Sequence, residues 1–271
     1  MIAICRESAD PCLSWPILQL VAHKTESPRK ATLVIFMRRA HNELTEELRN
    51  TILRAAVHGP WLEFPLNMSE FQTFIGGIFD TNAYLVKAPA GEILFDAPTG
   101  TLGWLEQQNL TPHLLLITHG HIDHIDDAAK IKKRFGCQVG CHADSVPLIS
   151  NPDFFKQFGF FLEPEPVQPD FLISEGKSQD FLSSIFDVLL VPGHCPGSLC
   201  FFSPEQNFLV GGDVLFAGSI GRTDLPGGNH SELIENLFSK VLVLPDGTRV
   251  LPGHGPVTTI GEEKRHNPFL R

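Results

Sequence analysis

The stretch Thr118-His119-Gly120-His121-Ile122-Asp123-His124 places three imidazoles and a carboxylate within six residues. It directly follows an apolar run over residues 113–118, which is typical of a strand buried on both faces. It leads into residues 123–135, whose pattern predicts a helix. Burying so many polar groups without partners would cost several kcal/mol. Four candidate ligands at a strand-to-helix turn therefore indicate a metal site, and imidazole and carboxylate groups suit Zn²⁺, Fe²⁺ or Mn²⁺.

The spacing within this stretch favours two metal ions over one. His119 and His121 are one residue apart, so in an extended segment both side chains point the same way. Asp123 and His124 come where the chain begins to coil, so they point elsewhere. The stretch alone makes an incomplete site, and further ligands must arrive from other strand ends. Three candidates each follow an apolar strand and sit in a turn rich in glycine or proline, namely His194, Asp213 and His254.

Outward from this stretch, short predicted strands alternate with predicted helices, which favours the α/β class. The pattern predicts strands over residues 71–75, 83–87, 92–96, 113–118, 138–142, 187–191, 199–202, 208–211 and 249–251. It predicts helices over residues 98–108, 123–135 and 231–242.

The two ends of the chain differ in charge. Residues 1–67 hold 8 Lys and Arg against 7 Asp and Glu, whereas residues 68–271 hold 13 against 24. Prolines interrupt the first segment, and its one credible helix would follow Asn42 and stop at Gly59. We interpret residues 1–67 as an extension that is disordered or precedes a native start at Met68, with a docking or targeting arm as the alternative. Residues 68–271 would form the catalytic domain.

Composition narrows the class of protein. The 271 residues are 42% hydrophobic and 19% charged, which excludes a disordered chain. The net charge of −10 argues against a nucleic-acid partner, which would need clustered positive charge. No uncharged apolar stretch is long enough to span a membrane. Six cysteines are too few for a disulfide scaffold and favour a reducing, cytoplasmic location. Nothing in the sequence indicates an oligomeric state.

Taken together, T-H-x-H-x-D-H, the later P-G-H, the G-D and the final P-G-H-G-P resemble the hydrolases of the metallo-β-lactamase superfamily over residues 71–269. The resemblance implies an αββα sandwich with the site at one edge of the sheets. It implies two divalent metal ions, with zinc expected and iron or manganese as alternatives. The implied ligands are His119, His121 and His194 for metal 1 and Asp123, His124 and His254 for metal 2, with Asp213 bridging them.

Within the superfamily the chain is similar to compact bacterial glyoxalase II enzymes. The segment Gly221-Arg222-Thr223-Asp224 resembles a motif that these enzymes share with persulfide dioxygenases, and residues 258–268 resemble the compact ending. Only 17 residues follow His254, so the glutathione contacts that a C-terminal helical domain makes in longer glyoxalase II enzymes are not transferred.

The implied activity is that of a hydroxyacylglutathione hydrolase, a thioester hydrolase whose substrate is a small molecule. Metal-bound hydroxide would attack the carbonyl of a thioester such as S-lactoylglutathione, and we assign Asp123 a second, catalytic role in orienting the nucleophile. Two alternatives stay open. One is a persulfide dioxygenase with a single iron on His119, His194 and Asp213. The other is a hydrolase of the same fold that acts on another ester or a lactone.

An anionic glutathione conjugate calls for basic residues near the mouth of the site. Arg222 and His266 are the candidate substrate contacts, the second mainly because of the family-like ending. An ion pair between Arg222 and Asp224 is the competing interpretation for the first. Lys177, Lys264 and Arg265 are weaker candidates, and the aromatic stretch over residues 151–169 either covers the pocket or packs on the sandwich.

Overall fold

The computed structural model describes residues 21–23, 32–34, 71–151, 153, 154, 156 and 164–271, and the chain divides into two compact units between Leu66 and Asn67. In the first unit, β1 (Val21–His23) pairs antiparallel with β2 (Thr32–Val34). The helix expected after Asn42, and most of the predicted extension, lie outside the described residues. The interpretation of residues 1–67 therefore stays a prediction, as does the domain boundary at Met68.

Two six-stranded mixed sheets form the centre of the second unit. The first has the order β3-β4-β5-β6-β7-β8, in which β3 to β5 are antiparallel and β5 to β8 are parallel. Its strands are β3 (Phe71–Gly76), β4 (Thr81–Ala88), β5 (Gly91–Phe95), β6 (Leu114–Leu116), β7 (Gln138–Cys141) and β8 (Phe171–Leu172).

The second sheet has the order β16-β15-β12-β11-β10-β9, in which only β12 and β15 are parallel neighbours. Its strands are β9 (Gly176–Phe181), β10 (Ser184–Leu190), β11 (Leu199–Ser203), β12 (Phe208–Gly212), β15 (Arg249–Pro252) and β16 (Thr258–Thr259). A separate hairpin joins β13 (Leu215–Phe216) to β14 (Ser219–Ile220).

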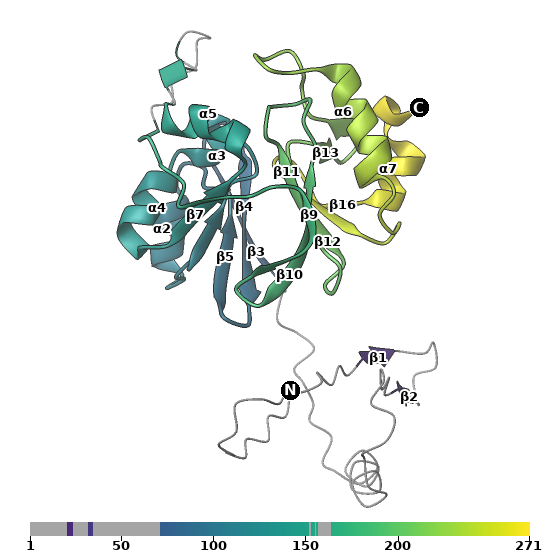
Figure 1. Ribbon diagram of the computed structural model, residues 1–271, viewed down its shortest axis with the longest axis horizontal. Coiled ribbons are helices and arrows are strands. Elements are labelled where there is room, and N and C mark those ends of the chain that lie inside the picture. The colour runs from purple at the N-terminus through teal and green to yellow at the C-terminus, as the bar shows by residue number, and fades with distance from the viewer. Residues whose placement is uncertain (1–20, 24–31, 35–70, 152, 155, 157–163) are drawn as a thin grey trace, which may run out of the picture. The chain divides into compact units, whose positions relative to one another are not determined.

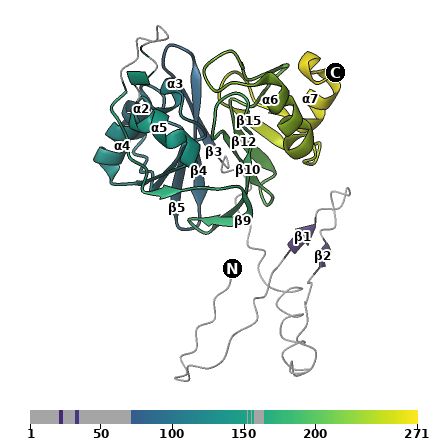
Figure 2. The ribbon, with the colours of Figure 1, turned by 45° about the horizontal axis from the view of Figure 1, so that its top comes forward.

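Helices cover the outer face of each sheet, as Figure 1 and Figure 2 show from two directions. The helices on the first sheet are α2 (Thr101–Gln107), α3 (Ile122–Ile125), α4 (Ala128–Phe135) and α5 (Val146–Ser150), and those on the second are α6 (His230–Asn236) and α7 (Ile260–His266). Three apolar clusters fill the spaces between the resulting four layers. The predicted αββα sandwich is thereby confirmed.

Strand β4 shows why the sequence forms a sandwich. Ala83 and Leu85 pack into the cluster beneath the helices, whereas Tyr84 and Val86 pack into the cluster between the sheets. Successive side chains of a strand point to opposite faces, so the continuous apolar run over residues 83–86 must be covered on both sides. The described helices include none with the length and apolar character that a bilayer crossing requires.

The structure differs from the expected single helix over residues 123–135. The chain forms α3 and α4 instead, and Asp126 and Asp127 lie at the junction. The Asp127 carboxylate accepts hydrogen bonds from the backbone N–H groups of Gly100 and Leu102, at 2.8 and 3.1 Å. These groups belong to the start of α2, whose unpaired N–H groups favour a negative charge. The hydrogen bonds that Asp127 makes to the start of α2 therefore outweigh the hydrogen bonds of one continuous helix over residues 123–135.

The two sheets are joined at one edge of the sandwich, where β4 begins and β15 ends. The backbone N–H of Asn82 donates to the carbonyl of Gly253 at 2.7 Å, and the Tyr84 hydroxyl donates to the carbonyl of Pro252 at 2.8 Å. The Asn82 side chain donates to Pro252 as well, at 2.9 Å. These bonds fix the loop that carries His254 against the first sheet, so ligands from both sheets meet at this edge.

Candidate metal centre

His119, His121 and His194 form one group of side chains at the joined edge. His119 and His121 follow β6, and His194 follows β10 on the other sheet. His121 has extended backbone angles, φ −69° and ψ 146°, as its place before the helix predicts. The Nε2 atoms of His119 and His194 lie 3.3 Å apart, and the ring centroids of His121 and His194 are 4.5 Å apart. Three imidazoles thus converge on one point.

Asp123, His124 and His254 form a second group beside the first. Oδ2 of Asp123 lies 3.2 Å from Nε2 of His254 and 3.6 Å from Nε2 of His124. Asp213 lies between the groups, because its Oδ2 is 3.5 Å from Nε2 of His194 and 3.4 Å from Nε2 of His254. The structure therefore brings together all seven side chains that the sequence singled out as metal ligands, with one carboxylate in contact with both groups.

Four of the histidines are held in a fixed orientation by hydrogen bonds at Nδ1. Nδ1 of His194 donates to the carbonyl of Arg222 at 2.7 Å, and Nδ1 of His254 donates to the carbonyl of Phe79 at 2.9 Å. Nδ1 of His124 donates to the Asp96 carboxylate at 2.8 Å. His119 donates to the Thr118 hydroxyl oxygen at 3.0 Å. Because Nδ1 of each ring is engaged in this way, Nε2 is the nitrogen that each ring can present to a metal ion, which is how second partners orient histidine ligands.

The donor atoms fit a divalent cation. Among the described residues, Nε2 of His124 and Oδ1 of Asp213 are two of three buried side-chain polar atoms without a hydrogen-bond partner. They face each other at 3.3 Å without the alignment of a hydrogen bond. Leaving such atoms unsatisfied is costly, and a cation between them would satisfy both. Imidazole and carboxylate ligands are the set that Zn²⁺, Fe²⁺ and Mn²⁺ accept. The cluster is thus capable of binding metal ions.

The first group is neutral before any metal binds. Burial lowers the pKa of His119 well below its usual value and that of His121 to about 3, and neighbouring imidazoles lower both further. Burial lowers the pKa of His194 as well. Metal ligation requires the neutral imidazole, so these three side chains lose no proton when a cation binds.

The second group carries charge. Burial raises the pKa of the Asp123 carboxyl, but His124 and His254 outweigh burial and lower that pKa to about 2. Burial lowers the pKa of His254, yet hydrogen bonds with Asp123 and Asp213 outweigh it and raise that pKa to about 10. In the metal-free protein, protons on imidazoles therefore balance the ionised carboxylates, and a bound cation would take over that role.

Two supporting residues were missed by the sequence reasoning, Asp96 and Thr81. Asp96 is buried after β5 and accepts hydrogen bonds from the backbone and hydroxyl of Thr118, both at 2.8 Å. Thr81 donates through its hydroxyl to Oδ2 of Asp123 at 2.9 Å. Asp96 directly follows the apolar run of β5, so the strand-end rule that found Asp213 would have found it too. Thr81 carries no local signal, because its partner is distant in the chain.

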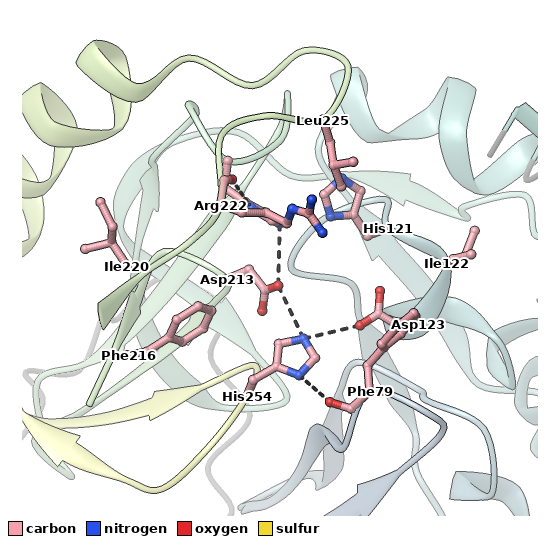
Figure 3. Close-up of a pocket in the computed structure, with 11 residues that line it drawn as sticks. Phe79, His121, Ile122, Asp123, Asp213, Phe216, Ile220, Arg222, Leu225 and His254 are labelled. Atoms are coloured by element: carbon pink, nitrogen blue, oxygen red, sulfur yellow. Dashed lines mark hydrogen bonds and ion pairs between the residues drawn. The ribbon is translucent and has the colours of Figure 1, made fainter. Parts of the chain in front are cut away.

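A cavity of about 430 Å³ opens on the ligand cluster (Figure 3). Its remaining lining is mostly apolar. The side chains that line it are Phe79, His121, Ile122, Asp123, His194, Asp213, Phe216, Ile220, Arg222, Leu225 and His254.

The two candidate substrate contacts differ in position. Arg222 lines the cavity, and its guanidinium makes two hydrogen bonds of 2.7 Å to the exposed carboxylate of Asp224. His266 ends α7, where its exposed ring lies 3.7 Å from Glu262, and it is not among the lining residues. The role of His266 as a substrate contact stays a prediction. Lys264 is likewise paired elsewhere, with Asp246 at 2.6 Å.

The other stretches named from the sequence contribute little to the described site. Lys177 is exposed on β9 and does not line the cavity. Much of the aromatic stretch over residues 151–169 lies outside the described residues, so its role as a cover stays a prediction. Its described Val167 packs in the core beneath the helices of the first sheet.

Comparison with known families agrees with this geometry. The model of the metallo-beta-lactamase superfamily matches residues 76–254, which include every candidate ligand. The chain belongs to the metallo-beta-lactamase superfamily. Family and ligand cluster together make it a metal-dependent hydrolase of that superfamily.

Similar members of the metallo-beta-lactamase superfamily include enzymes and solved structures. Hydroxyacylglutathione hydrolase GloC of Haemophilus influenzae is 38% identical over 169 residues, which are 61% of this chain and 79% of GloC. The crystal structure of BLEG-1 B3 metallo-beta-lactamase is 36% identical with a TM-score of 0.69, covering 74% of this chain and 99% of that one. TTHA1623, solved in a di-iron-bound form, is 35% identical with a TM-score of 0.65, covering 73% and 100%.

Proposed function

We propose that this metallohydrolase cleaves thioesters of glutathione, as a hydroxyacylglutathione hydrolase does, and that residues 68–271 are its catalytic domain. One observation carries the proposal. Seven imidazole and carboxylate side chains converge at one edge of the sandwich. Five of them line a cavity large enough for a small molecule, namely His121, Asp123, His194, Asp213 and His254. The similarity to GloC supports a thioester as the bond that is cleaved.

We propose that the site holds two divalent ions. His119, His121 and His194 would hold one, Asp123, His124 and His254 the other, and Asp213 would contact both. Zinc is the expected metal, and iron or manganese also suits these donors. The di-iron-bound form of TTHA1623 supports iron as the main alternative. When bound, such ions make hydroxide available at neutral pH and polarise a carbonyl group.

The protein's own side chains would position the reactants. Asp123 belongs both to the ligand cluster and to the cavity lining, so its carboxylate reaches the substrate space. The Thr81 hydroxyl holds one of its oxygens at 2.9 Å. We therefore assign Asp123 the catalytic role of orienting the attacking nucleophile. The departing thiolate is stable enough to need little protonation, so no separate general acid is required.

A single-iron persulfide dioxygenase is the alternative from a different enzyme class. Such a site would use His119, His194 and Asp213 and leave the second group without an ion. The unpartnered Nε2 atom of His124 lies in that second group. A metal ion bound by the second group would give Nε2 of His124 a partner, and this favours the two-metal hydrolase.

The test is metal content by elemental analysis on protein purified without chelator, coupled to cleavage of S-lactoylglutathione. We expect close to two metal ions per chain together with turnover. The variants His121→Ala and Asp123→Ala should fold normally and lose activity, because each removes a ligand. The exposed His230, at the start of α6, offers the matched control His230→Ala, which should leave metal content and turnover unchanged.

Two results would overturn the proposed two-metal site, and a third would overturn the proposed substrate. Close to one iron per chain, with oxygen uptake on glutathione persulfide and no thioester cleavage, would establish the dioxygenase. Activity of His121→Ala above about a tenth of the wild-type rate in metal-replete protein would remove His121 from the site. Turnover of a simple ester or a lactone in place of the thioester would keep the two-metal site and change the substrate.

We propose further that the protein acts on a small molecule in the cytoplasm. The cavity volume supports a small-molecule substrate. The described cysteines, Cys137, Cys141, Cys195 and Cys200, are all buried and form no disulfide, which agrees with a reducing compartment.

A further inference from the structure

The cavity is apolar on the sides that surround the ligand cluster. We call Phe79, Ile122, Phe216, Ile220 and Leu225 the apolar rim. Figure 3 shows Phe216 and Ile220 together on one side of the cluster, Ile122 on the opposite side and Leu225 above. A group bound beside the metal ligands is therefore enclosed by carbon atoms from several directions.

The rim is built to keep its shape. The ring of Phe216 packs edge-on against the ring of His254, with 6.1 Å between centroids. The pairing of β13 with β14 sets Ile220 opposite Leu215. The turn between these strands is tied to the C-terminal helix, because the buried carboxylate of Glu263 accepts from the backbone N–H of Gly218 at 2.8 Å. A preformed apolar surface binds an apolar group without an ordering cost.

The same cavity offers little to a charged group. Apart from histidines, Arg222 is the only cationic side chain among the described lining residues. Its Nε and Nη2 atoms both donate hydrogen bonds to the Asp224 carboxylate. Burying carboxylates or an ammonium group without uncommitted partners is unfavourable. The glutathione part of a thioester carries both kinds of group, so it belongs at the solvent side of the cavity. The acyl part then faces the apolar rim.

We propose that the apolar rim is an acyl-binding site that selects thioesters with branched aliphatic or aromatic acyl groups over hydroxyacyl groups. This inference rests on the proposed thioester hydrolysis and adds the substrate class. The contacts that carry it come from Phe216, Ile220 and Leu225, none of which is a candidate metal ligand.

The sharpest test compares two glutathione thioesters of nearly equal shape, S-lactoyl and S-(2-methylpropanoyl), which differ by a hydroxyl in place of a methyl group. Each kcat/KM is divided by the rate constant of that thioester's own hydrolysis by hydroxide, which removes the difference in intrinsic reactivity. We expect the methyl compound to be favoured by at least about fivefold, because the rim desolvates the hydroxyl without a partner. Along straight-chain acyl groups, kcat/KM should rise about fourfold per methylene.

The variants Phe216→Ala and Leu225→Ala should each reduce this preference to within about twofold of unity. The preference is a ratio within one preparation, so a change in metal occupancy does not alter it. Phe216→Leu should restore much of the preference. Phe238 is half exposed on the π-helical turn Leu237–Val241 and does not line the cavity, so Phe238→Ala is the matched control and should keep the wild-type ratio.

A binding experiment separates this inference from the hydrolysis itself. S-methylglutathione and S-hexylglutathione cannot be hydrolysed, and calorimetry on the metal-loaded protein should show a tighter Kd for the longer chain, by about fourfold per methylene. Equal affinities, or a preference for the lactoyl thioester, would overturn the acyl site and leave thioester hydrolysis standing. Absence of all thioester cleavage, with tighter binding of the hexyl compound, would instead overturn the proposed function.

Discussion

The buried carboxylate of Asp96 lies 2.8 Å from Nδ1 of His124. The same carboxylate accepts the Thr118 hydroxyl, whose oxygen in turn accepts from Nδ1 of His119. His119 and His124 belong to different ligand groups, so one carboxylate orients a histidine in each. The two halves of the candidate metal centre are thus coupled through a residue that is itself not a candidate ligand.

Asp96→Asn should weaken metal binding by about 10- to 100-fold, because both carboxylate oxygens of Asp96 accept hydrogen bonds and the amide nitrogen of asparagine would face a donor in place of one of them. Asp96 has a positive φ of 59°, a conformation that asparagine also tolerates, so the fold should be retained. The measurement is the Kd for Zn²⁺ by competition with a chelator. Asp153→Asn, at an exposed carboxylate paired with Lys156, is the control. Equal Zn²⁺ affinities of both variants would show that Asp96 has no orienting role.

Gly253→Ala should disrupt the metal centre directly. A methyl group at Gly253 would contact Oδ1 of Asp213 and lie 2.7 Å from Cε1 of His124. One of these candidate ligands must then move, and we expect bound metal to fall by at least about tenfold at limiting Zn²⁺. The control is Gly103→Ala in α2, where a methyl group meets nothing within 4 Å. That variant should keep its metal and gain up to about 1 kcal/mol of stability. Normal metal content in Gly253→Ala would contradict the close packing of Gly253 against Asp213 and His124.

Glu263→Gln should lower the free energy of unfolding by about 1–3 kcal/mol. The buried carboxylate accepts three hydrogen bonds, from the Gly218 backbone, the Thr258 hydroxyl at 2.6 Å and the Asn267 amide at 2.8 Å. In glutamine an amide nitrogen replaces one of these oxygens. The amide nitrogen is a donor, so it would face another donor and at least one hydrogen bond would be lost. Urea unfolding of the metal-free protein measures the change. Glu262→Gln, one residue away and exposed, should stay within about 0.5 kcal/mol of wild type. Equal losses in both variants would contradict a specific role for Glu263.

Asp224→Asn should release the Arg222 guanidinium toward the mouth of the cavity. We expect KM for an anionic glutathione thioester to fall about two- to fivefold at low ionic strength, with kcat unchanged, because only substrate attraction changes. Added salt should remove the difference. Asp246→Asn makes the same change of charge beside Lys264, away from the cavity lining, and should leave KM unaltered. A similar fall of KM in both variants would show that the net charge of the protein, and not the release of Arg222, causes the effect.

The sequence could single out the seven side chains that meet at this edge because their signal is local. Each candidate follows an apolar strand, and strand ends are where this sandwich presents its side chains. The split between α3 and α4 was not predictable in that way. It depends on Asp127 capping α2 through the backbone of Gly100, which lies 27 residues earlier in the chain. The same holds for Thr81, which is 42 residues from Asp123. Pairings across such separations leave no periodic trace in the sequence.

His266 is the opposite case, a side chain expected at the site that does not line the cavity. A resemblance in the ending of the chain placed this side chain near the substrate, whereas α7 turns its last residue toward solvent. The helix instead contributes Glu263, which supports the hairpin that carries Phe216 and Ile220. The sequence resemblance marked the correct helix, but the packing of that helix selects which side chain faces inward.

The sequence by itself determined the class of fold, the set of imidazole and carboxylate groups and the family to which the chain belongs, because strand patterning and ligand types are local properties. Only the tertiary structure decided how Asp96 links the two ligand groups and which apolar side chains form the rim of the cavity. Those relationships arise where loops from two sheets meet. Their geometry is set by the packing of segments that are far apart in the chain.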